Sequence, residues 1–331
     1  MAQARYDVVG IGSAIVDIIS RADEDFLGRH GMTKGTMALM TAAQSKQLYD
    51  EMGHGVEMSG GSAANSMAGI ASLGGKPAFI GKVGADKLGE IFSHEIKVVG
   101  VDFHAGAKNS TKLPTAVCLI LVTSDAQRTM NTYLGACTEM GPDDIDADVI
   151  SAADVTYIEG YQWDTPQAKA AIRKACTVAK GAGRKVALSL SDPFVVDRHR
   201  DDLLDLIFHH VDLIFGNEEE VFRLYRTNDF DTAVKKLRQS NTLACMTLGA
   251  RGAVVVDTLG IDTVPAAPVK AVVDTTGAGD LFAAGFLYGY THGRDLVRSA
   301  KIGAMAAAEI ISHMGARPET PLRDLLRQHD L

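Results

Sequence analysis

Apolar runs of strand length alternate with longer amphipathic segments along most of the chain. The runs are rich in β-branched residues, which predicts strands, and the segments between them repeat their apolar residues at helical spacing. The predicted strands are residues 7–12, 78–81, 116–122, 155–159, 186–191, 213–216, 244–248 and 253–257, and the predicted helices include 42–52, 87–99, 166–182, 218–225 and 232–239. Because this alternation is typical of βαβ units, we expect an α/β fold whose central sheet is mostly parallel and flanked by helices.

Two segments, residues 14–40 and 103–135, break this alternation. They carry strand-like pieces with no predicted helix between them, and antiparallel hairpins need only short turns. We therefore expect a small β-sheet that forms a lid. The lid would be inserted into a large α/β unit made of about residues 1–13, 41–102 and 136–331, because no repeat or linker marks a separate terminal domain.

The composition excludes several classes of protein. With 331 residues and 46% hydrophobic content, the chain can bury a sizeable core, so we do not expect disorder. Its 33 basic and 41 acidic residues give a net charge of −8, which argues against a nucleic-acid partner. No apolar stretch reaches the roughly 18 residues that span a bilayer, so we expect no membrane partner. The four cysteines form no CxxC pair, which favours a reducing, cytoplasmic compartment.

The strongest chemical signal is the segment 274–280, DTTGAGD, which precedes a helical pattern. Gly277, Ala278 and Gly279 leave their backbone N–H groups unobstructed at an expected helix N-terminus, which favours an anion such as a transferring phosphoryl group. Asp280 follows in the first turn, where a carboxylate could accept a hydroxyl proton. The alternative is an ordinary turn with a capping aspartate. No GxxxxGK[ST] loop is present, so the chain is not a P-loop enzyme.

Two further segments are candidates for binding a substrate. The Gly60–Gly61 pair of GGSAANSM lets a ligand approach the backbone closely, and Asn65 offers both a donor and an acceptor to neighbouring hydroxyls. The alternative there is a plain junction between a loop and a helix. Asp17 follows the first predicted strand in GIGSAIVD. A dinucleotide-binding GxGxxG, and with it an oxidoreductase, would need glycine where this chain has Ile15.

These segments resemble the two signatures of the ribokinase-like (pfkB) family of carbohydrate and nucleoside kinases, with Gly74 and Gly84 at the expected later spacings. Met67 stands where the family has a small residue. The resemblance covers essentially the whole chain, from Val8 to about Pro318, and implies a ribokinase-like fold in a single kinase unit, 1–331.

The same resemblance assigns roles to the candidate residues. It implies that Gly277, Ala278 and Gly279 form an anion hole and that Asp280 is the catalytic base. The acceptor-binding residues it implies are Asp17, Gly60, Gly61 and Asn65, although Ser13 stands where many adenosine kinases have asparagine. The ATP-binding residues it implies are Asn217, Thr247, Gly249, Gly252 and Gly279. For the turn that holds Gly249 and Gly252, a β-hairpin is the alternative.

The resemblance also implies Mg²⁺ with the ATP. Glu220, in the NxxE-like segment that begins at Asn217, would organise the Mg²⁺, through water in many relatives, while an acidic first helical turn is the alternative. Asp274 and Thr276 flank the anion hole in the manner of the family's monovalent-cation site, which gives the hypothesis of a K⁺ ion there.

Three details favour adenosine kinases within the family. They are the layout of residues 34–52 before Gly60, the segment 132–137, and the strand end at 157–161, which would place Tyr161 near a nucleoside base. Glu159 is a candidate sugar contact, as in ribokinases.

We therefore expect ATP-dependent transfer to the 5′ hydroxyl of adenosine, giving AMP and ADP. A ribokinase, a fructokinase or a 2-keto-3-deoxygluconate kinase is the alternative, and a non-catalytic nucleoside-binding protein is a more distant one. The expected partner is a small nucleoside or sugar, and the protein could be a monomer or a homodimer.

Overall fold

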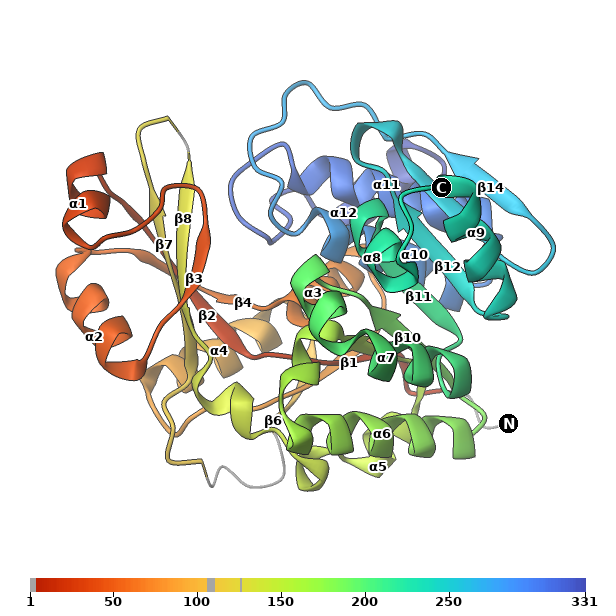
Figure 1. Cartoon of the computed structure of the whole chain (residues 1–331), viewed down its shortest axis with the longest axis horizontal. Coiled ribbons are helices and arrows are strands. Elements are labelled where there is room, and N and C mark those ends of the chain that lie inside the picture. Colours follow the sequence, from red (N-terminus) through yellow and green to blue (C-terminus); the bar gives the residue numbers. More distant parts are fainter. Residues whose placement is uncertain (1–3, 106–110, 126) are drawn as a thin grey trace.

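The computed structural model describes residues 4–105, 111–125 and 127–331, which build two β-sheets and their covering helices (Figure 1). The large sheet has nine strands in the order β14-β13-β12-β11-β10-β9-β1-β5-β6. These strands are β1 (Tyr6–Ile11), β5 (Pro77–Gly81), β6 (Asp102–Ala105), β9 (Ala153–Glu159), β10 (Lys185–Ser189), β11 (Leu213–Asn217), β12 (Leu243–Thr247), β13 (Ala253–Val256) and β14 (Ile261–Val264). All neighbouring strands from β12 to β6 are parallel, and β13 and β14 are antiparallel additions.

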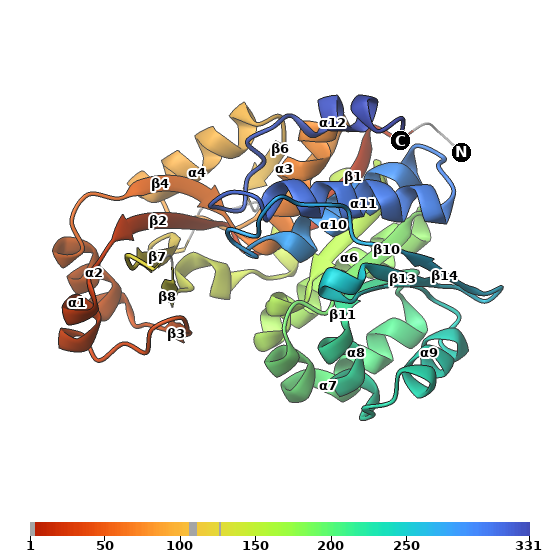
Figure 2. The same cartoon turned by 90° about the horizontal axis from the view of Figure 1, so that it is seen from above.

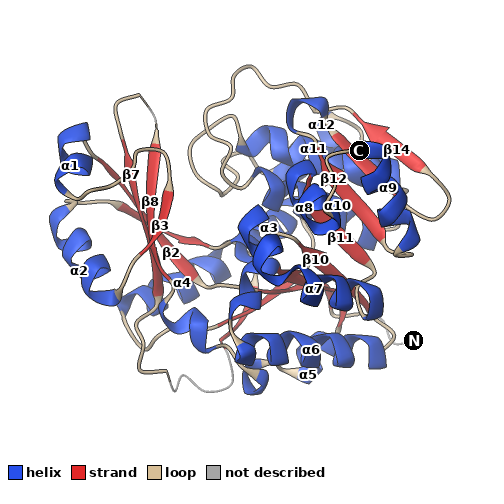
Figure 3. Cartoon of the chain, in the orientation of Figure 1, coloured by secondary structure: helices blue, strands red, loops and turns tan. Residues whose placement is uncertain are grey.

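Helices cover both faces of the large sheet (Figure 3). The helices of the described chain are α1 (Glu24–Arg29), α2 (Ala42–Glu51), α3 (Ser62–Leu73), α4 (Lys87–Val98), α5 (Ala147–Ser151), α6 (Pro166–Gly181), α7 (Pro193–His209), α8 (Glu218–Tyr225), α9 (Phe230–Gln239), α10 (Ala278–Thr291), α11 (Leu296–Ile310) and α12 (Leu322–Gln328). One apolar core includes side chains of α3, α10 and α11, and a second includes those of α6 to α9. The view from above separates α10 and α11 from α7 and α8 (Figure 2). The predicted α/β fold with a mostly parallel sheet is confirmed.

The small sheet has five strands in the order β3-β8-β7-β2-β4 and lies to the left of the large sheet in Figure 1. Its strands are β2 (Ile15–Arg21), β3 (Met37–Leu39), β4 (Val56–Gly60), β7 (Ala116–Val122) and β8 (Arg128–Tyr133). The sheet mixes parallel pairs, such as β2 with β7, with antiparallel pairs, such as β7 with β8. The predicted second, smaller sheet is therefore present.

The division of the chain into two units stays a prediction. Two strands, however, belong to other sheets than its predicted bounds imply. Strand β4, placed by sequence in the large unit, pairs with β2 of the small sheet, while β6 overlaps the predicted lid segment but pairs with β5 of the large sheet. Residues 106–110 and 126 of that segment lie outside the described residues. Helix α1 also lies where no helix was predicted. It is capped by Asp23 and buries only Leu27, so it leaves no apolar period in the sequence.

No helix in the described part of the chain is both long and apolar enough to cross a membrane. The four cysteines are buried and free of disulfides.

Close packing of α3 on α10 depends on Gly69. A Cβ atom at this position would lie 2.7 Å from the Ala284 Cβ and 2.7 Å from the Leu281 Cδ1, which is closer than real Cβ contacts allow. The missing side chain lets the two helices approach, and this approach brings their first turns together.

Gly69→Val should therefore lower the free energy of unfolding by about 1–3 kcal/mol, because overpacking must push α3 and α10 apart. Chemical denaturation measures the change. The matched control is Gly181→Val at the end of α6, where an added Cβ would meet nothing within 4 Å. Equal effects of the two substitutions would show that helix propensity, and not packing, governs residue 69.

Candidate active site

The carboxyl ends of the parallel strands meet at one edge of the large sheet. The strand registers pair Glu159 with Ser189 and Asn217 with Thr247, so these strand ends lie side by side. Ligands of open parallel sheets bind at this edge, beyond the strand ends. The structure thus gathers at one edge three residues that the sequence marked as site residues in separate segments.

The first turns of α3 and α10 meet at the carboxylate of Asp280. Ser62 donates through its Oγ to Asp280 Oδ1 at 2.7 Å, and Asn65 donates through its Nδ2 to Asp280 Oδ2 at 2.9 Å. Ser66 Oγ also donates to the Asp280 backbone carbonyl at 3.0 Å. Two helix N-termini, each carrying partial positive charge, therefore face the same carboxylate.

The predicted anion hole coincides with the start of α10. Gly277 is the N-cap, with φ at +78°, and Ala278 and Gly279 are the first two helical residues. Their N–H groups are among those that a helix cannot pair internally. Ala278 N–H is used locally, since it donates to the Thr275 carbonyl at 3.2 Å. The role of these amides in binding an anion stays a prediction.

Competing influences act on the protonation of Asp280. Burial raises its pKa, while the hydrogen bonds from Ser62 and Asn65 and the positive charge of Arg317 oppose the rise. A carboxylate with hydrogen-bond donors and a nearby cation can remain ionised, which is the form that a general base requires.

Asp17 lies on β2 and reaches the same region from the small sheet. A Cβ atom at residue 60 would overlap the Asp17 carboxylate, so the glycine makes room for this side chain. Burial raises the pKa of Asp17 to about 7, against the charges of Arg317 and Arg128, and the nearby Asp280 raises it further. Two acidic groups, one on the small sheet and one in the first turn of α10, therefore lie near each other.

The Oδ1 atom of Asn65 is buried and accepts no hydrogen bond from the residues that the structure describes. A buried acceptor without a donor is costly, and native proteins leave few of them. This oxygen can accept a hydrogen bond from a hydroxyl group of a bound acceptor molecule, and the predicted contact of Asn65 stays a prediction.

Glu159 does not fit its predicted contact with a sugar. The residue is fully buried, and its Oε1 accepts from the Ser13 N–H at 2.7 Å and from Gln162 Nε2 at 3.2 Å. Its Oε2 accepts from the Ala63 N–H at 2.9 Å. These bonds direct both oxygens at the protein itself. Tyr161, the other residue predicted there, is 41% exposed and donates through its hydroxyl to the Ser191 carbonyl at 3.2 Å.

A family model for pfkB carbohydrate kinases matches residues 32–323. The chain belongs to the pfkB family of carbohydrate kinases. It shares 49% identity with the adenosine kinase from Sinorhizobium meliloti, with a TM-score of 0.89 over 98% of this chain and 100% of that one. It shares 46% identity with a probable sugar kinase protein from Rhizobium etli CFN 42, with a TM-score of 0.91 over 99% of each chain. The adenosine kinase of Saccharomyces cerevisiae is 28% identical over 93% of this chain and 95% of its own length.

This pfkB kinase is an ATP-dependent phosphotransferase with an alcohol as acceptor, as the sequence predicted. Four of its predicted nucleotide residues lie where β11 and β12 end, while Gly279 lies in the first turn of α10. Thr247 ends β12, and Gly249 and Gly252 turn the chain into the antiparallel β13, so the hairpin alternative is observed and the nucleotide role stays a prediction. Gly252 closes this turn through its carbonyl, which accepts from the Leu248 N–H at 2.8 Å.

Asn217 and Glu220 form a reciprocal cap at the start of α8. Asn217 donates through its Nδ2 and its backbone N–H to the two Glu220 carboxylate oxygens at 2.8 and 2.9 Å, and the Glu220 N–H donates to Asn217 Oδ1 at 2.9 Å. The alternative of an acidic first turn is thus observed. Burial raises the pKa of Glu220 to about 7. Each of its oxygens has a further acceptor position, which fits a water molecule of a hydrated Mg²⁺ ion.

Direct protein ligands for a metal are few. In the part of the chain that the structure describes, no group of three or more His, Cys, Asp and Glu side chains could hold an ion. Mg²⁺ keeps several waters and commonly binds through one or two carboxylates plus substrate phosphates. The residues present therefore fit a magnesium ion that arrives with ATP.

Sequence reasoning missed two arginines. Arg317 donates to the Ser59 carbonyl at 3.1 Å and to the Ala64 carbonyl at 2.7 Å, which places its charge near Asp17 and Asp280. Burial lowers the pKa of Arg317 to about 10. Arg128 pairs with Asp274 at 2.8 Å. Neither arginine belongs to a recognisable motif, and the contacts cross more than a hundred residues of chain, so no local pattern marks them.

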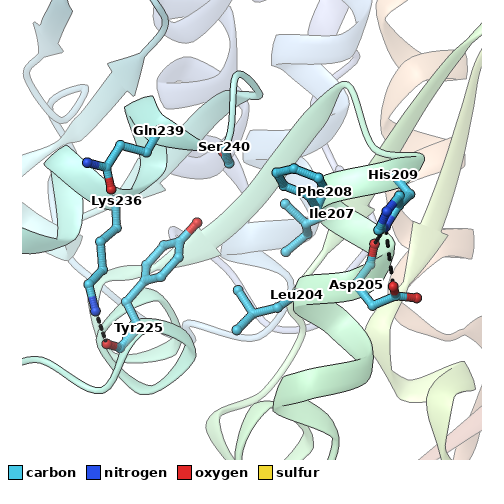
Figure 4. A pocket seen from close by; sticks show the side chains of 9 residues that line it. All are labelled: Leu204, Asp205, Ile207, Phe208, His209, Tyr225, Lys236, Gln239 and Ser240. Atoms are coloured by element: carbon cyan, nitrogen blue, oxygen red, sulfur yellow. Dashed lines mark hydrogen bonds and ion pairs between the residues drawn. The ribbon is translucent and has the colours of Figure 1, made fainter.

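A surface hollow of about 540 Å³ lies away from these residues, between α7, the end of α8 and α9 (Figure 4). Its lining includes Leu204, Phe208, Tyr225 and Lys236, and none of the predicted site residues. A smaller hollow of about 190 Å³ borders β3 and the end of β8.

Asp280→Asn should lower kcat by about 10²-fold or more, because an amide cannot accept the hydroxyl proton. The amide is nearly isosteric with the carboxylate, so acceptor binding should persist. Steady-state kinetics and calorimetric binding separate the two effects. Near-normal turnover in a folded variant would remove Asp280 from the mechanism.

The pKa of Asp17 predicts a pH effect on stability. Its folded pKa of about 7 exceeds the ordinary aspartate value of 3.8, so the folded protein holds this proton more tightly than the unfolded chain. Ionisation of Asp17 therefore destabilises the fold, and this cost is absent below about pH 4, grows towards pH 7 and is complete above it.

Asp17→Asn should accordingly raise the thermal unfolding midpoint, relative to the wild type, more at about pH 8 than at about pH 4. The matched control is Asp50→Asn, which changes an exposed ion pair with Lys46. A difference that does not vary with pH would show that Asp17 titrates normally.

Proposed function

We propose that this kinase transfers the γ-phosphoryl group of ATP to the 5′ hydroxyl of adenosine. The observation that carries the proposal is a row of side chains across the small sheet. The strand registers align Asp17 with Cys118, Cys118 with Thr132, and Thr132 with Leu39. Cross-strand neighbours share a face of the sheet, and Thr132 donates through its Oγ1 to Cys118 Sγ at 3.3 Å.

The row is polar at one end and apolar at the other. Asp17 and the open Asn65 oxygen can accept hydroxyl protons, while Leu39 is 64% exposed. Thr132 lies two strand spacings from Asp17, roughly 10 Å, and Leu39 lies three spacings away, roughly 14 Å. This length suits a nucleoside whose ribose meets Asp17 and whose base lies against the far strands. A free sugar would leave the apolar end uncovered.

The hollow at the apolar end fits a flat base. It is lined by Leu39, Met40, Leu113, Thr132, Tyr133, Leu134, Gly135 and Thr138. Ligand pockets are mostly apolar with a few polar groups that fix orientation. The backbone and hydroxyl groups of the threonines can supply those polar contacts to a purine.

The mechanism follows from the placement of Asp280 between the acceptor site and the anion loop. Asp280 accepts the 5′ hydroxyl proton, while Ser62 and Asn65 hold its carboxylate in position. The amides of Gly277 and Gly279 stabilise the charge on the transferring phosphoryl group. Mg²⁺ would be held by the phosphates and, through water, by Glu220, and it supplies neutralisation of phosphate charge. The small sheet covers the acceptor and excludes water.

The likeness to the Sinorhizobium meliloti adenosine kinase supports this acceptor, whereas the likeness to a probable sugar kinase supports a sugar. The burial of Glu159 favours the nucleoside, because this residue was the candidate sugar contact and its carboxylate is bonded to the backbone instead.

Adenosine should be a better substrate than 2′-deoxyadenosine by roughly ten- to a hundredfold in kcat/KM, since a lost hydroxyl leaves a buried partner unpaired at a cost of about 1–3 kcal/mol. Asp17→Ala should reduce the ratio of kcat/KM for adenosine to that for 2′-deoxyadenosine, and the exposed control Asp50→Ala should leave this ratio unchanged. ADP release measures both across a panel of nucleosides and sugars. If ribose, fructose or a keto-deoxy sugar acid exceeds adenosine in kcat/KM, the acceptor is a sugar.

A further inference from the structure

A buried ion pair joins the small sheet to the loop that precedes the predicted anion hole. Arg128, the first residue of β8, places its Nη1 atom 2.8 Å from Asp274 Oδ2, and each side chain is only 8% exposed. Arg128 Nη2 also lies 3.5 Å from the Met314 sulfur. Asp274 begins the DTTGAGD segment, so a residue of the small sheet contacts the loop that leads to Gly277.

The other bonds of Asp274 shape this loop. Its Oδ1 accepts from the Thr276 backbone N–H at 3.1 Å and from the Thr276 hydroxyl at 2.8 Å. Its Oδ2 accepts from the Gly315 N–H at 3.1 Å and forms the ion pair with Arg128. The Val273 N–H donates to the Ile311 carbonyl at 2.8 Å, which fastens the loop to the end of α11.

Three hydrogen bonds and a guanidinium surround the carboxylate of Asp274. An ionised carboxylate has about four lone-pair positions, two on each oxygen. Thr276 uses both positions on Oδ1, Gly315 uses one on Oδ2, and the Arg128 guanidinium lies 2.8 Å from that second oxygen. The carboxylate therefore does not fit the K⁺ ion that the sequence suggested for Asp274 and Thr276, because a second cation would have to displace the guanidinium or one of these donors.

We propose that the Arg128 guanidinium takes the place of a monovalent cation beside the anion loop, so that this kinase needs no such ion. Arg128 is then a positioning residue: it acts through Asp274 and Thr276 to hold the loop with its amides aimed at the phosphoryl group. A guanidinium suits this role, since it is always charged and its planar fork matches a carboxylate.

The arrangement makes the anion loop depend on the small sheet. A dissolved cation could organise the loop at any time, whereas Arg128 can do so only when β8 is in place. The loop would then be complete only while the small sheet covers the acceptor, which limits transfer of the phosphoryl group to water.

The first test uses the unaltered protein. Phosphoryl transfer is measured in potassium chloride and in tetramethylammonium chloride at equal ionic strength, with ATP and Mg²⁺ in excess. We expect kcat values within about twofold of each other. A stimulation of kcat by potassium of about fivefold or more overturns the proposal. This test does not depend on the folding of any variant.

The second test asks whether Arg128 is the residue that makes the kinase independent of potassium. Arg128→Met should lower kcat in tetramethylammonium by roughly 10²-fold and should gain a potassium stimulation of about fivefold or more, because the ion can now reach Asp274. Arg128→Lys keeps the charge and should stay insensitive to potassium. The matched control is Arg173→Met, which removes a partly exposed ion pair with Asp205 on the far side of the sheet and should leave the salt response unchanged.

The inference about Arg128 rests on the kinase reaction of the proposed function. Thermal unfolding, which needs no catalysis, tests the two separately. Potassium should raise the thermal unfolding midpoint of Arg128→Met relative to tetramethylammonium, but not that of the unaltered protein. A midpoint and a rate that fall equally in both salts would mean that Arg128 is merely structural, which overturns the proposal. Because unfolding needs no acceptor, a failure of adenosine as substrate would leave this result intact and would count only against the acceptor assignment.

Discussion

The geometry of the site depends on one buried carboxylate, that of Glu159. Its oxygens accept from the Ser13 N–H, in the turn between β1 and β2, and from the Ala63 N–H, in the first turn of α3. Burying an ionised group costs several kcal/mol, and burial raises the pKa of Glu159 accordingly. The positive end of α3 and the charge-assisted hydrogen bonds offset that cost. A Cβ atom at residue 12 would overlap the Glu159 carboxylate, so Gly12 keeps the space open.

Two chains of contacts begin at this carboxylate. Ser13 leads within four residues to Asp17, on the face of the small sheet that the proposed acceptor would occupy. Ala63 lies between Ser62 and Asn65, the two residues that hold Asp280. The distance between the proposed acceptor contacts and the proposed base is therefore set by a group that touches neither the acceptor nor the phosphate. Such supporting contacts decide whether a site is held within the small tolerance that catalysis requires.

The sequence predicted most of the large sheet because parallel strands are buried on both faces and leave continuous apolar runs, as in the fully buried β5. The starts of α3 and α10 were predictable from their glycine-rich signatures. The role of Glu159 was not, since a strand-end glutamate looks the same whether it faces a ligand or the backbone. Strand β4 was also missed. Its residues alternate between polar and apolar over only five positions, and its partner β2 lies about forty residues earlier.

Arg128 and Arg317 show why local sequence patterns do not predict the charge interactions of the site. Each interacts with carboxylates of other elements: Arg128 forms an ion pair with Asp274, and the charge of Arg317 interacts with Asp17 and Asp280. The charge of Arg317 opposes the rise in pKa that burial causes at Asp17 and Asp280, and Arg128 also opposes it at Asp17. One arginine belongs to β8 of the small sheet, and the other belongs to the segment after α11. The charge state that the proposed chemistry needs therefore depends on the packing of the small sheet against α10 and the segment after α11, because each supplies a charge that the others balance.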